Sequence, residues 1–265
     1  MTGEIHGTGT SGATAPGPST LGLLRFQGPD AGKFLQGQLS NDMGGLRADA
    51  LLLAGLHNPQ GRVLALLRLV APAPDDIVAL LPAELAEATA ATLRRYVLRA
   101  KLSIGCDTSA ASLHGLAAHI PAVEARLAPQ SRALDIAAGV PQVYAATSGE
   151  FVAQMLNLDC VGAISFNKGC YTGQEIIARA HYRGRMKRRM QRFVSTGPMP
   201  LAPGQVFTLH DGRSAQLVDA IAHPDGRSEF LAVAALEPPA GDATSAAAKP
   251  LVAVQPLPLP YALPE

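Results

Sequence analysis

Short apolar runs are the feature of this sequence that most limits its fold. Pro, Arg or Asp interrupts every run before it reaches the eighteen or so apolar residues that a membrane-spanning helix needs. The chain has 265 residues, of which 48% are hydrophobic and 16% charged, so it can bury a sizeable core. Short runs with Gly and Pro turns between them predict strands mixed with short helices.

The first portion, residues 21–130, is predicted to be α+β. Its apolar runs predict strands at 21–26, 51–57, 62–70, 76–81, 101–106 and 112–118. Helices are predicted from Gly28-Pro29-Asp30 to about Leu39, and from Pro82 to about Leu98. Because these elements do not repeat as regular βαβ units, the pattern favours an antiparallel sheet backed by helices.

The remaining chain is divided into a central segment, 131–185, and a C-terminal part, 186–265. In the central segment we expect strands at 134–137 and 143–146, a helix that a Thr147–Glu150 capping box opens and that runs through Leu158, and a second helix from Gly173 or Gln174. Short strands separated by Asp-Gly turns then predict a small C-terminal β-barrel, with a closing edge strand within 251–261. Residues 1–20, rich in Gly, Ser, Thr and Pro, are predicted to be a disordered tail without signal-peptide character.

Two glycines bracket a cysteine just before the second central helix, in the segment Lys168-Gly169-Cys170-Tyr171-Thr172-Gly173-Gln174-Glu175. Glycine allows positive φ and close approach to a ligand, and a helix N-terminus with a nearby lysine favours a thiolate. One interpretation is therefore a ligand-facing loop with an activated Cys170. The other is a helix-entry turn with a buried, inert cysteine, and spacing alone favours neither.

A basic cluster follows this segment. Seven of the 22 Lys and Arg residues fall within residues 179–192, although the net charge of the chain is only +1. Such a cluster binds phosphates or carboxylates, or is simply a solvated face. Tyr182 is its one aromatic residue, which does not favour an RNA surface that stacks bases. The cysteines and histidines show no metal-ligand spacing, and no phosphate-binding glycine motif is present.

These residues resemble the YgfZ family, a branch of the folate-binding group that includes the aminomethyltransferase (T-protein) of the glycine cleavage system. The resemblance is carried by the complete motif at 168–175, by Gln154-Met155-Leu156-Asn157 before it and by Arg183-Gly184 after it, and it extends to Phe34-Leu35-Gln36-Gly37-Gln38 and Pro256-Leu257-Pro258-Leu259-Pro260-Tyr261. It implies two ferredoxin-like α+β portions around a central folate pocket, with a C-terminal β-barrel.

The resemblance also implies a function. It is that of a cytoplasmic, monomeric accessory protein that binds tetrahydrofolate, or a one-carbon-substituted folate, and serves the assembly or repair of iron–sulfur enzymes, including a tRNA-modifying one. Its partners would be iron–sulfur client or assembly proteins, with no membrane and no direct nucleic acid. Cys170 is the candidate reactive residue, and the residues implied to bind folate are Gln154, Asn157, Lys168, Gly169, Tyr171, Gly173, Gln174, Glu175, Arg179 and Arg185.

The sequence departs from the transferases of this group. Where they carry a catalytic aspartate, this chain has Gly61-Arg62-Val63-Leu64-Ala65-Leu66, so aminomethyl transfer is the second function considered and an RNA-binding module the third. The segment from about Ala122 to Arg132 is shorter than in the family, and the chain has no Trp to stack on a pterin.

Overall fold

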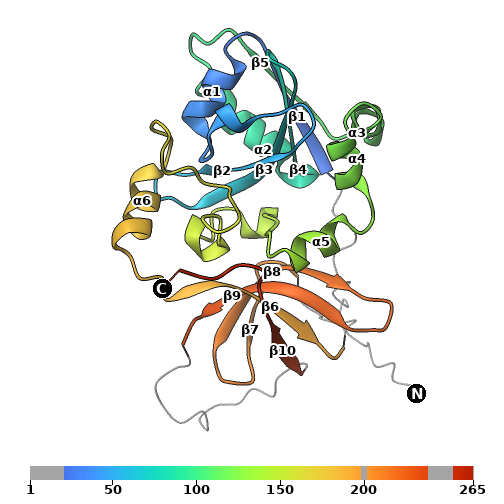
Figure 1. Ribbon diagram of the computed structural model, residues 1–265, viewed down its shortest axis with the longest axis vertical. Helices are drawn as coiled ribbons and strands as arrows, with labels where there is room; N and C mark the ends of the chain where they lie inside the picture. Colours follow the sequence, from blue (N-terminus) through green and yellow to red (C-terminus); the bar gives the residue numbers. More distant parts are fainter. Residues whose placement is uncertain (1–20, 198–201, 238–252, 265) are drawn as a thin grey trace, which may run out of the picture.

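Two five-stranded antiparallel sheets and six α-helices make up the described part of the chain (Figure 1). The computed structural model describes residues 21–197, 202–237 and 253–264. The first sheet has the order β2-β3-β4-β1-β5. Its strands are β1 (Leu21–Gln27), β2 (Leu52–His57), β3 (Val63–Ala73), β4 (Asp76–Pro82) and β5 (Ser103–Asp107).

Helices cover both faces of the first sheet. On one face, α1 (Ala31–Gln38) and α2 (Ala83–Arg94) pack against buried side chains such as Leu24 and Phe26. On the other, α3 (Ala110–Ala117) and α4 (Pro121–Leu127) pack against Leu23 and neighbouring side chains in a separate, smaller cluster. Successive strand residues point to opposite faces, so β1 contributes to both clusters.

The second sheet has the order β10-β6-β9-β8-β7. Its strands are β6 (Arg188–Ser195), β7 (Val206–Thr208), β8 (Ser214–Ala222), β9 (Ser228–Ala235) and β10 (Val254–Leu257). On one face, side chains of this sheet pack against one another in a separate cluster that includes the stacked rings of Phe193 and Phe230. The other contributes Met190 and Leu231 to the main core, which also contains side chains of the first sheet.

The central segment lies between the two sheets (Figure 1). It contains α5 (Ser131–Ala137), two short 3-10 turns, η2 (Ala145–Thr147) and η3 (Ala153–Leu156), and α6 (Gln174–Arg183) at one side. A further 3-10 turn, η1 (Met43–Gly45), follows α1. Buried residues of both sheets and the central segment share one core, so the interior is where a site built from distant parts of the chain can form.

Most predicted elements of the N-terminal and C-terminal parts are confirmed, including the β2–β3 hairpin and the edge strand β10, and so is the start of α6 in the central segment. The prediction of a strand at 112–118 is wrong, because these residues lie mainly in α3. Ser109 caps that helix, and Leu113 and Ala117, four residues apart, pack on the sheet. The same error affects 134–137, which belongs to α5.

The centre of the chain differs most from the prediction. Residues 143–146 form no strand, and Thr147 accepts a hydrogen bond from the amide of Tyr144 instead of Glu150. The helix expected through Leu158 is reduced to η3, which ends at Asn157 in the left-handed region (φ 54°). There the carbonyl oxygen of Gln154 accepts a hydrogen bond from the side chain of Arg189, which lies far along the chain.

The architecture also corrects the expected fold class. All strands before residue 188 belong to one sheet, so the described central segment forms no second ferredoxin-like sheet. In the second sheet, no described pairing joins the edge strands β7 and β10, so the described strands form an open sheet and not a closed barrel. The disordered tail predicted for residues 1–20 lies outside the described residues.

Candidate functional site

Lys168 is an anchor of the motif loop, which we call the Cys170 loop (residues 166–175). Its Nζ donates to the carbonyl oxygens of Gln36 and Leu39, both at 2.6 Å, and of Asn41, at 2.9 Å. These carbonyls lie at and just after the C-terminal end of α1, where a cation is favourable. Burial lowers the pKa of Lys168 to about 8. An ammonium has three donors, and here the chain itself occupies all of them.

Tyr171 is the second anchor of the loop. It is buried, its ring lies 5.1 Å from the Lys168 ammonium and 6.2 Å from the His57 ring, and burial raises its pKa to about 12. His57 ends β2 and is also buried, and neither ring nitrogen has a hydrogen-bond partner among the described residues. Burial lowers the pKa of His57 to about 4, so the imidazole is neutral at pH 7.

Gly173 is the third anchor. It has φ +84° and precedes α6, and a Cβ on it would lie 2.6 Å from the carbonyl oxygen of Asn58. Gly61 has φ +70°, and a Cβ on it would lie 3.1 Å from the side chain of Ile176 in α6. The β2–β3 turn and the start of α6 therefore touch through two glycines, which explains a motif glycine by packing. Gly169 has open space around its Cα, so no contact requires it to be glycine.

Cys170 stands exposed between these anchors. The interpretation of a buried cysteine at this position is therefore wrong, whereas the reactivity of the thiol stays a prediction. Cys106 and Cys160 are partly buried, and burial raises the pKa of both thiols, that of Cys160 to about 11. Of the three cysteines, Cys170 is the one that the fold presents to solvent.

Gln154 and Asn157 lie in the interior, behind the Cys170 loop. Gln154 donates to the carbonyl of Ile177 in α6, at 2.7 Å, and Asn157 donates to the carbonyl of Met190 in β6, at 2.8 Å. Beside them the buried Arg189 pairs with the buried Asp159 through two hydrogen bonds of 3.0 Å. These side chains connect the central segment to α6 and to the second sheet.

The other residues of the predicted site are at or near the surface. Gln174 is half-buried at the start of α6, and Glu175, Arg179 and Arg185 are exposed. The nearest acidic partner of Arg185 is Glu237, at 3.9 Å. The structure thus distributes the predicted site over three places: the interior, the Cys170 loop and the outer face of α6.

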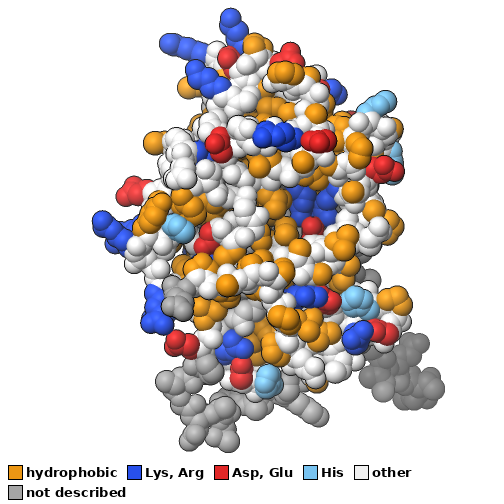
Figure 2. Space-filling view, viewed as in Figure 1, with side chains coloured by type: hydrophobic (Ala, Val, Ile, Leu, Met, Phe, Trp, Pro, Cys, Tyr) orange, Lys and Arg blue, Asp and Glu red, His pale blue; other side chains and the backbone are white. Residues whose placement is uncertain are grey.

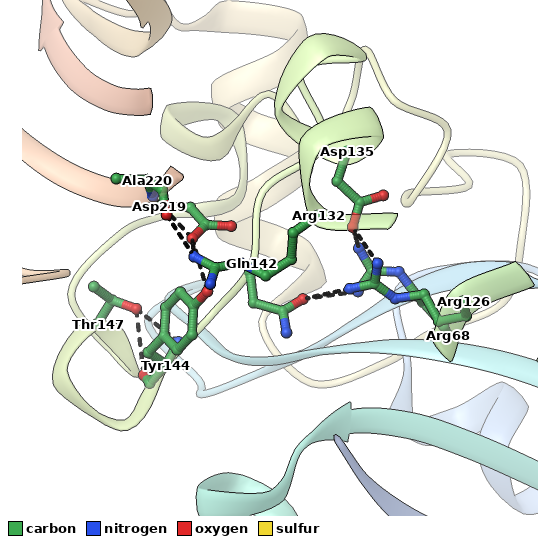
Figure 3. Close-up of polar contacts among 9 residues, drawn as sticks. All are labelled: Arg68, Arg126, Arg132, Asp135, Gln142, Tyr144, Thr147, Asp219 and Ala220. Atoms are coloured by element: carbon green, nitrogen blue, oxygen red, sulfur yellow. Dashed lines mark hydrogen bonds and ion pairs between the residues drawn. The ribbon is translucent and has the colours of Figure 1, made fainter. Parts of the chain in front are cut away.

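A second constellation, absent from the sequence analysis, lies between the sheets on the other side of the central segment (Figure 3). We call it the central arginine cluster. It comes from β3, α4, α5, the loop before η2 and β8, and consists of Arg68, Arg126, Arg132, Asp135, Gln142, Tyr144 and Asp219.

Asp135 is shared by two arginines of the cluster. Its Oδ2 lies 2.8 Å from Arg68 and 2.8 Å from Arg126. Gln142 bridges the same pair, because its Oε1 accepts from Arg68 at 3.0 Å and from Arg126 at 3.4 Å. Burial and the neighbouring charge of Arg126 lower the pKa of Arg68 to about 10.

Asp219 forms the other half of the cluster, and a β-bulge directs it inward. Leu217 pairs with Ala232 and Asp219 with Leu231, so Val218 is the extra residue. The bulge places Asp219 on the Leu231 side of the sheet, which faces the main core. There it accepts from Arg132 and, at 2.7 Å, from the Tyr144 hydroxyl. Burial raises the pKa of Asp219 and that of Tyr144.

The central arginine cluster contains more cationic donors than the described residues use. Three arginines face two aspartates, an excess of one positive charge. Arg126 Nε and Nη1, Arg132 Nε and Asp219 Oδ2 are buried without a hydrogen-bond partner in the described part of the chain, and Arg126 Nη1 approaches Asp135 without hydrogen-bond alignment. Buried donors of this kind are costly unless an acceptor meets them.

The sequence does contain a signal for this cluster. Arg68 interrupts the apolar run of β3, and Asp219 interrupts that of β8. A charged residue within a buried strand is rarely tolerated without a partner, so each marks an interior polar site. By contrast, Ala65 and Leu66, where transferases of this group carry an aspartate, are buried in the main apolar core.

Other kinds of site find no support in the described residues. No group of three or more His, Cys, Asp and Glu side chains there is arranged to hold a metal ion. Within the same residues, none of the helices has the length and apolar character to cross a membrane.

The fold is similar to that of an aminomethyltransferase. Aminomethyltransferase T of the glycine cleavage system from Bartonella henselae superposes with a TM-score of 0.60 over 82% of this chain and 76% of its own, at 16% identity. At that identity the likeness concerns the fold alone. No family model matches the chain.

Curated relatives identify the family. The chain is 30% identical over 221 residues to the tRNA-modifying protein YgfZ of Serratia proteamaculans, a match that covers 63% of this chain and 67% of the relative. It is 28% identical over 264 residues to the protein of the same name from Escherichia coli O157:H7, a match that covers 77% of this chain and 80% of the relative. The chain belongs to the YgfZ family.

Proposed function

We propose that this chain binds tetrahydrofolate, or a one-carbon-substituted folate, over the central arginine cluster. The observation that carries the proposal is the excess positive charge of that cluster together with its unused donors. Figure 2 shows Lys and Arg atoms on the face between the two sheets, and of the three arginines Arg132 keeps the most exposure, at 13% of its side chain.

The residues of the cluster fit the chemistry of a folate. A folate carries carboxylates, which pair well with guanidinium groups such as those of Arg126 and Arg132. Its pterin carries N–H donors, for which the unpartnered Oδ2 of Asp219 is an acceptor. Tyr144 offers an aromatic ring in a chain without tryptophan. When bound, a reduced folate supplies one-carbon chemistry.

We further propose that the chain is an accessory protein for the assembly or repair of iron–sulfur enzymes, including a tRNA-modifying one. The relatives named tRNA-modifying protein YgfZ support the second part of this role. Cys170, held exposed by the anchors at Lys168, Tyr171 and Gly173, is the candidate reactive thiol. Aminomethyl transfer is the less favoured function, since the side chains of Ala65 and Leu66 offer no carboxylate.

A titration with reduced folate tests the cofactor proposal. We expect calorimetry under anaerobic conditions to show saturable binding of tetrahydrofolate to the full chain. Arg126→Met should weaken it at least about tenfold, because a charged hydrogen bond contributes roughly 1.5–3 kcal/mol. Lys33→Gln removes one exposed charge from α1 and should bind as the wild type does. Absence of binding at millimolar folate would refute the proposal.

Complementation tests the accessory role separately. In a strain that lacks its own YgfZ protein, expression of this chain should restore the activity of iron–sulfur enzymes. Cys170→Ala should abolish the rescue, whereas Cys106→Ala should retain it. Full rescue by Cys170→Ala, at equal protein level, would remove the thiol from the mechanism.

A further inference from the structure

The structure divides the basic cluster of residues 179–192 into two parts. Three of its arginines serve the fold: Arg188 donates to Val233 O, Arg189 pairs with Asp159, and Arg192 pairs with Glu229. The other four cations are exposed, two on α6 and two on the chain after it: Arg179, Arg183, Arg185 and Lys187. Of these four, only Arg185 has an acidic partner among the described residues, Glu237 at 3.9 Å.

An aromatic group lies on the same helix as these free cations. The Phe166 ring stacks on His181 with centroids 3.8 Å apart, and Tyr182 meets both rings edge-on, at 6.0 and 4.8 Å. Phe166 lies fifteen residues before His181, so the sequence shows only the isolated Tyr182 and hides the group. Tyr182 is 68% exposed, so its ring is accessible to a partner.

The Tyr182 ring shares a face of α6 with two of the free cations. Tyr182 follows Arg179 by three residues, and Arg183 follows Arg179 by four. Residues at these two spacings are neighbours on a helix surface. A cavity of about 610 Å³, lined in part by Arg185, Lys187 and Leu236, lies on the chain just beyond the helix. Exposed rings, free cations and a groove therefore follow one another over residues 179–187.

We propose that this α6 surface, defined by Phe166, Arg179, His181, Tyr182, Arg183 and Lys187, binds a single-stranded nucleic acid. Phosphates would pair with the cations, and an unpaired base would stack on Tyr182. An acidic protein segment would use the cations but has no need of a stacked aromatic group. A duplex has no free base face to offer. The surface is distinct from the central arginine cluster, so this inference does not depend on folate binding.

Fluorescence anisotropy with labelled twelve-nucleotide single strands, one RNA and one DNA, tests the inference on the full chain. We expect micromolar binding that weakens about 50-fold between 50 and 200 mM salt, for some four phosphate contacts. Arg183→Gln/Lys187→Gln should weaken binding at least tenfold. Tyr182→Ala should weaken single-strand binding about tenfold and leave binding of heparin, a polyanion without bases, unchanged. The RNA and DNA arms decide which nucleic acid is preferred.

A second exposed tyrosine among arginines provides the matched control. Tyr96 is 48% exposed, beside the exposed Arg95 and Arg99, but makes no ring contact within the described residues. Tyr96→Ala and Arg95→Gln/Arg99→Gln should leave binding unchanged. Equal losses from both sets, heparin binding that falls with Tyr182→Ala, or no binding at 100 µM protein would each overturn the inference. Tetrahydrofolate titration of the α6 variants should match the wild type, which separates this result from that for the cofactor.

Discussion

Lys168 and the central arginine cluster are both cationic sites taken partly or wholly out of water, but they differ in how their donors are used. The Lys168 ammonium donates to three backbone carbonyls at 2.6–2.9 Å, so nothing of it is left for a ligand. In the cluster, Arg126 and Arg132 retain donors without a partner among the described residues. The most recognisable motif of the chain thus contains a cation whose three donors are all in use.

This difference separates two uses of buried charge. A cation whose donors all meet protein acceptors fixes the relative positions of the segments it joins, and its loss should lower stability. A cation with donors to spare costs stability in the free protein and recovers that cost when an anion binds. Substitutions in the two regions should therefore have opposite effects on stability and on binding.

The largest loss of stability should follow from breaking the buried pair behind the Cys170 loop. Asp159→Asn leaves the charge of Arg189 without a counter-ion in the interior, because both side chains are almost fully buried. We expect the free energy of unfolding to fall by about 3–5 kcal/mol in urea denaturation. Asp225→Asn removes an ion pair with Arg227 that is exposed to solvent, and it should change stability far less. Equal effects would mean that the Asp159 pair is not isolated from solvent.

Lys168→Met should cost somewhat less, about 2–3 kcal/mol, because it leaves three carbonyls at and just after the end of α1 without their donor. Urea denaturation measures the loss, and the exposed Lys187→Met is the matched control. If the lysine only fixes the loop, the folded variant should still bind tetrahydrofolate with the affinity of the wild type. A stable variant that no longer binds folate would reverse the assignment and make Lys168 a ligand residue.

His57 tests whether an unpartnered group in the well-satisfied region behaves as a buried neutral base. Its pKa is about 4 in the folded chain against 6.5 in an unfolded one. Between these values the unfolded chain takes up a proton that the folded chain refuses, so stability is complete above pH 6.5 and falls as the pH drops towards 4. We expect about 3 kcal/mol of this loss to disappear in His57→Leu, measured as the difference between the two proteins across pH 4–7. Parallel pH profiles would show that His57 protonates freely.

The same comparison explains what the sequence could and could not predict. Local signals were sufficient for the β2–β3 hairpin and for the start of α6, where Gly61 and Gly173 mark positions that only glycine fits. They failed at 134–137 and through Leu158, where side-chain contacts from distant parts of the chain determine the backbone. The contiguous motif of the Cys170 loop was found because its residues are adjacent.

The central arginine cluster was missed for the opposite reason. Its members extend from Arg68 to Asp219, and only the folding of two sheets onto the central segment brings them together. The inward direction of Asp219 depends on a bulge at Val218 that no residue pattern announces. Charged residues inside apolar runs were the available signal, and they mark positions without naming partners.

Arg126→Met should have the smallest effect on stability and the clearest effect on binding. The substitution removes one of three arginines but leaves Asp135 paired with Arg68 at 2.8 Å, and it removes two unpartnered donors. We therefore expect the free energy of unfolding to stay within about 1 kcal/mol of the wild type, or to rise, while tetrahydrofolate affinity falls. Arg68→Met is the matched control, since Arg68 uses its donors on Asp135 and Gln142 and should cost about 3 kcal/mol or more. A loss of that size with Arg126→Met as well would mean that the cluster is a structural network like that of Lys168, with no donors held for a ligand.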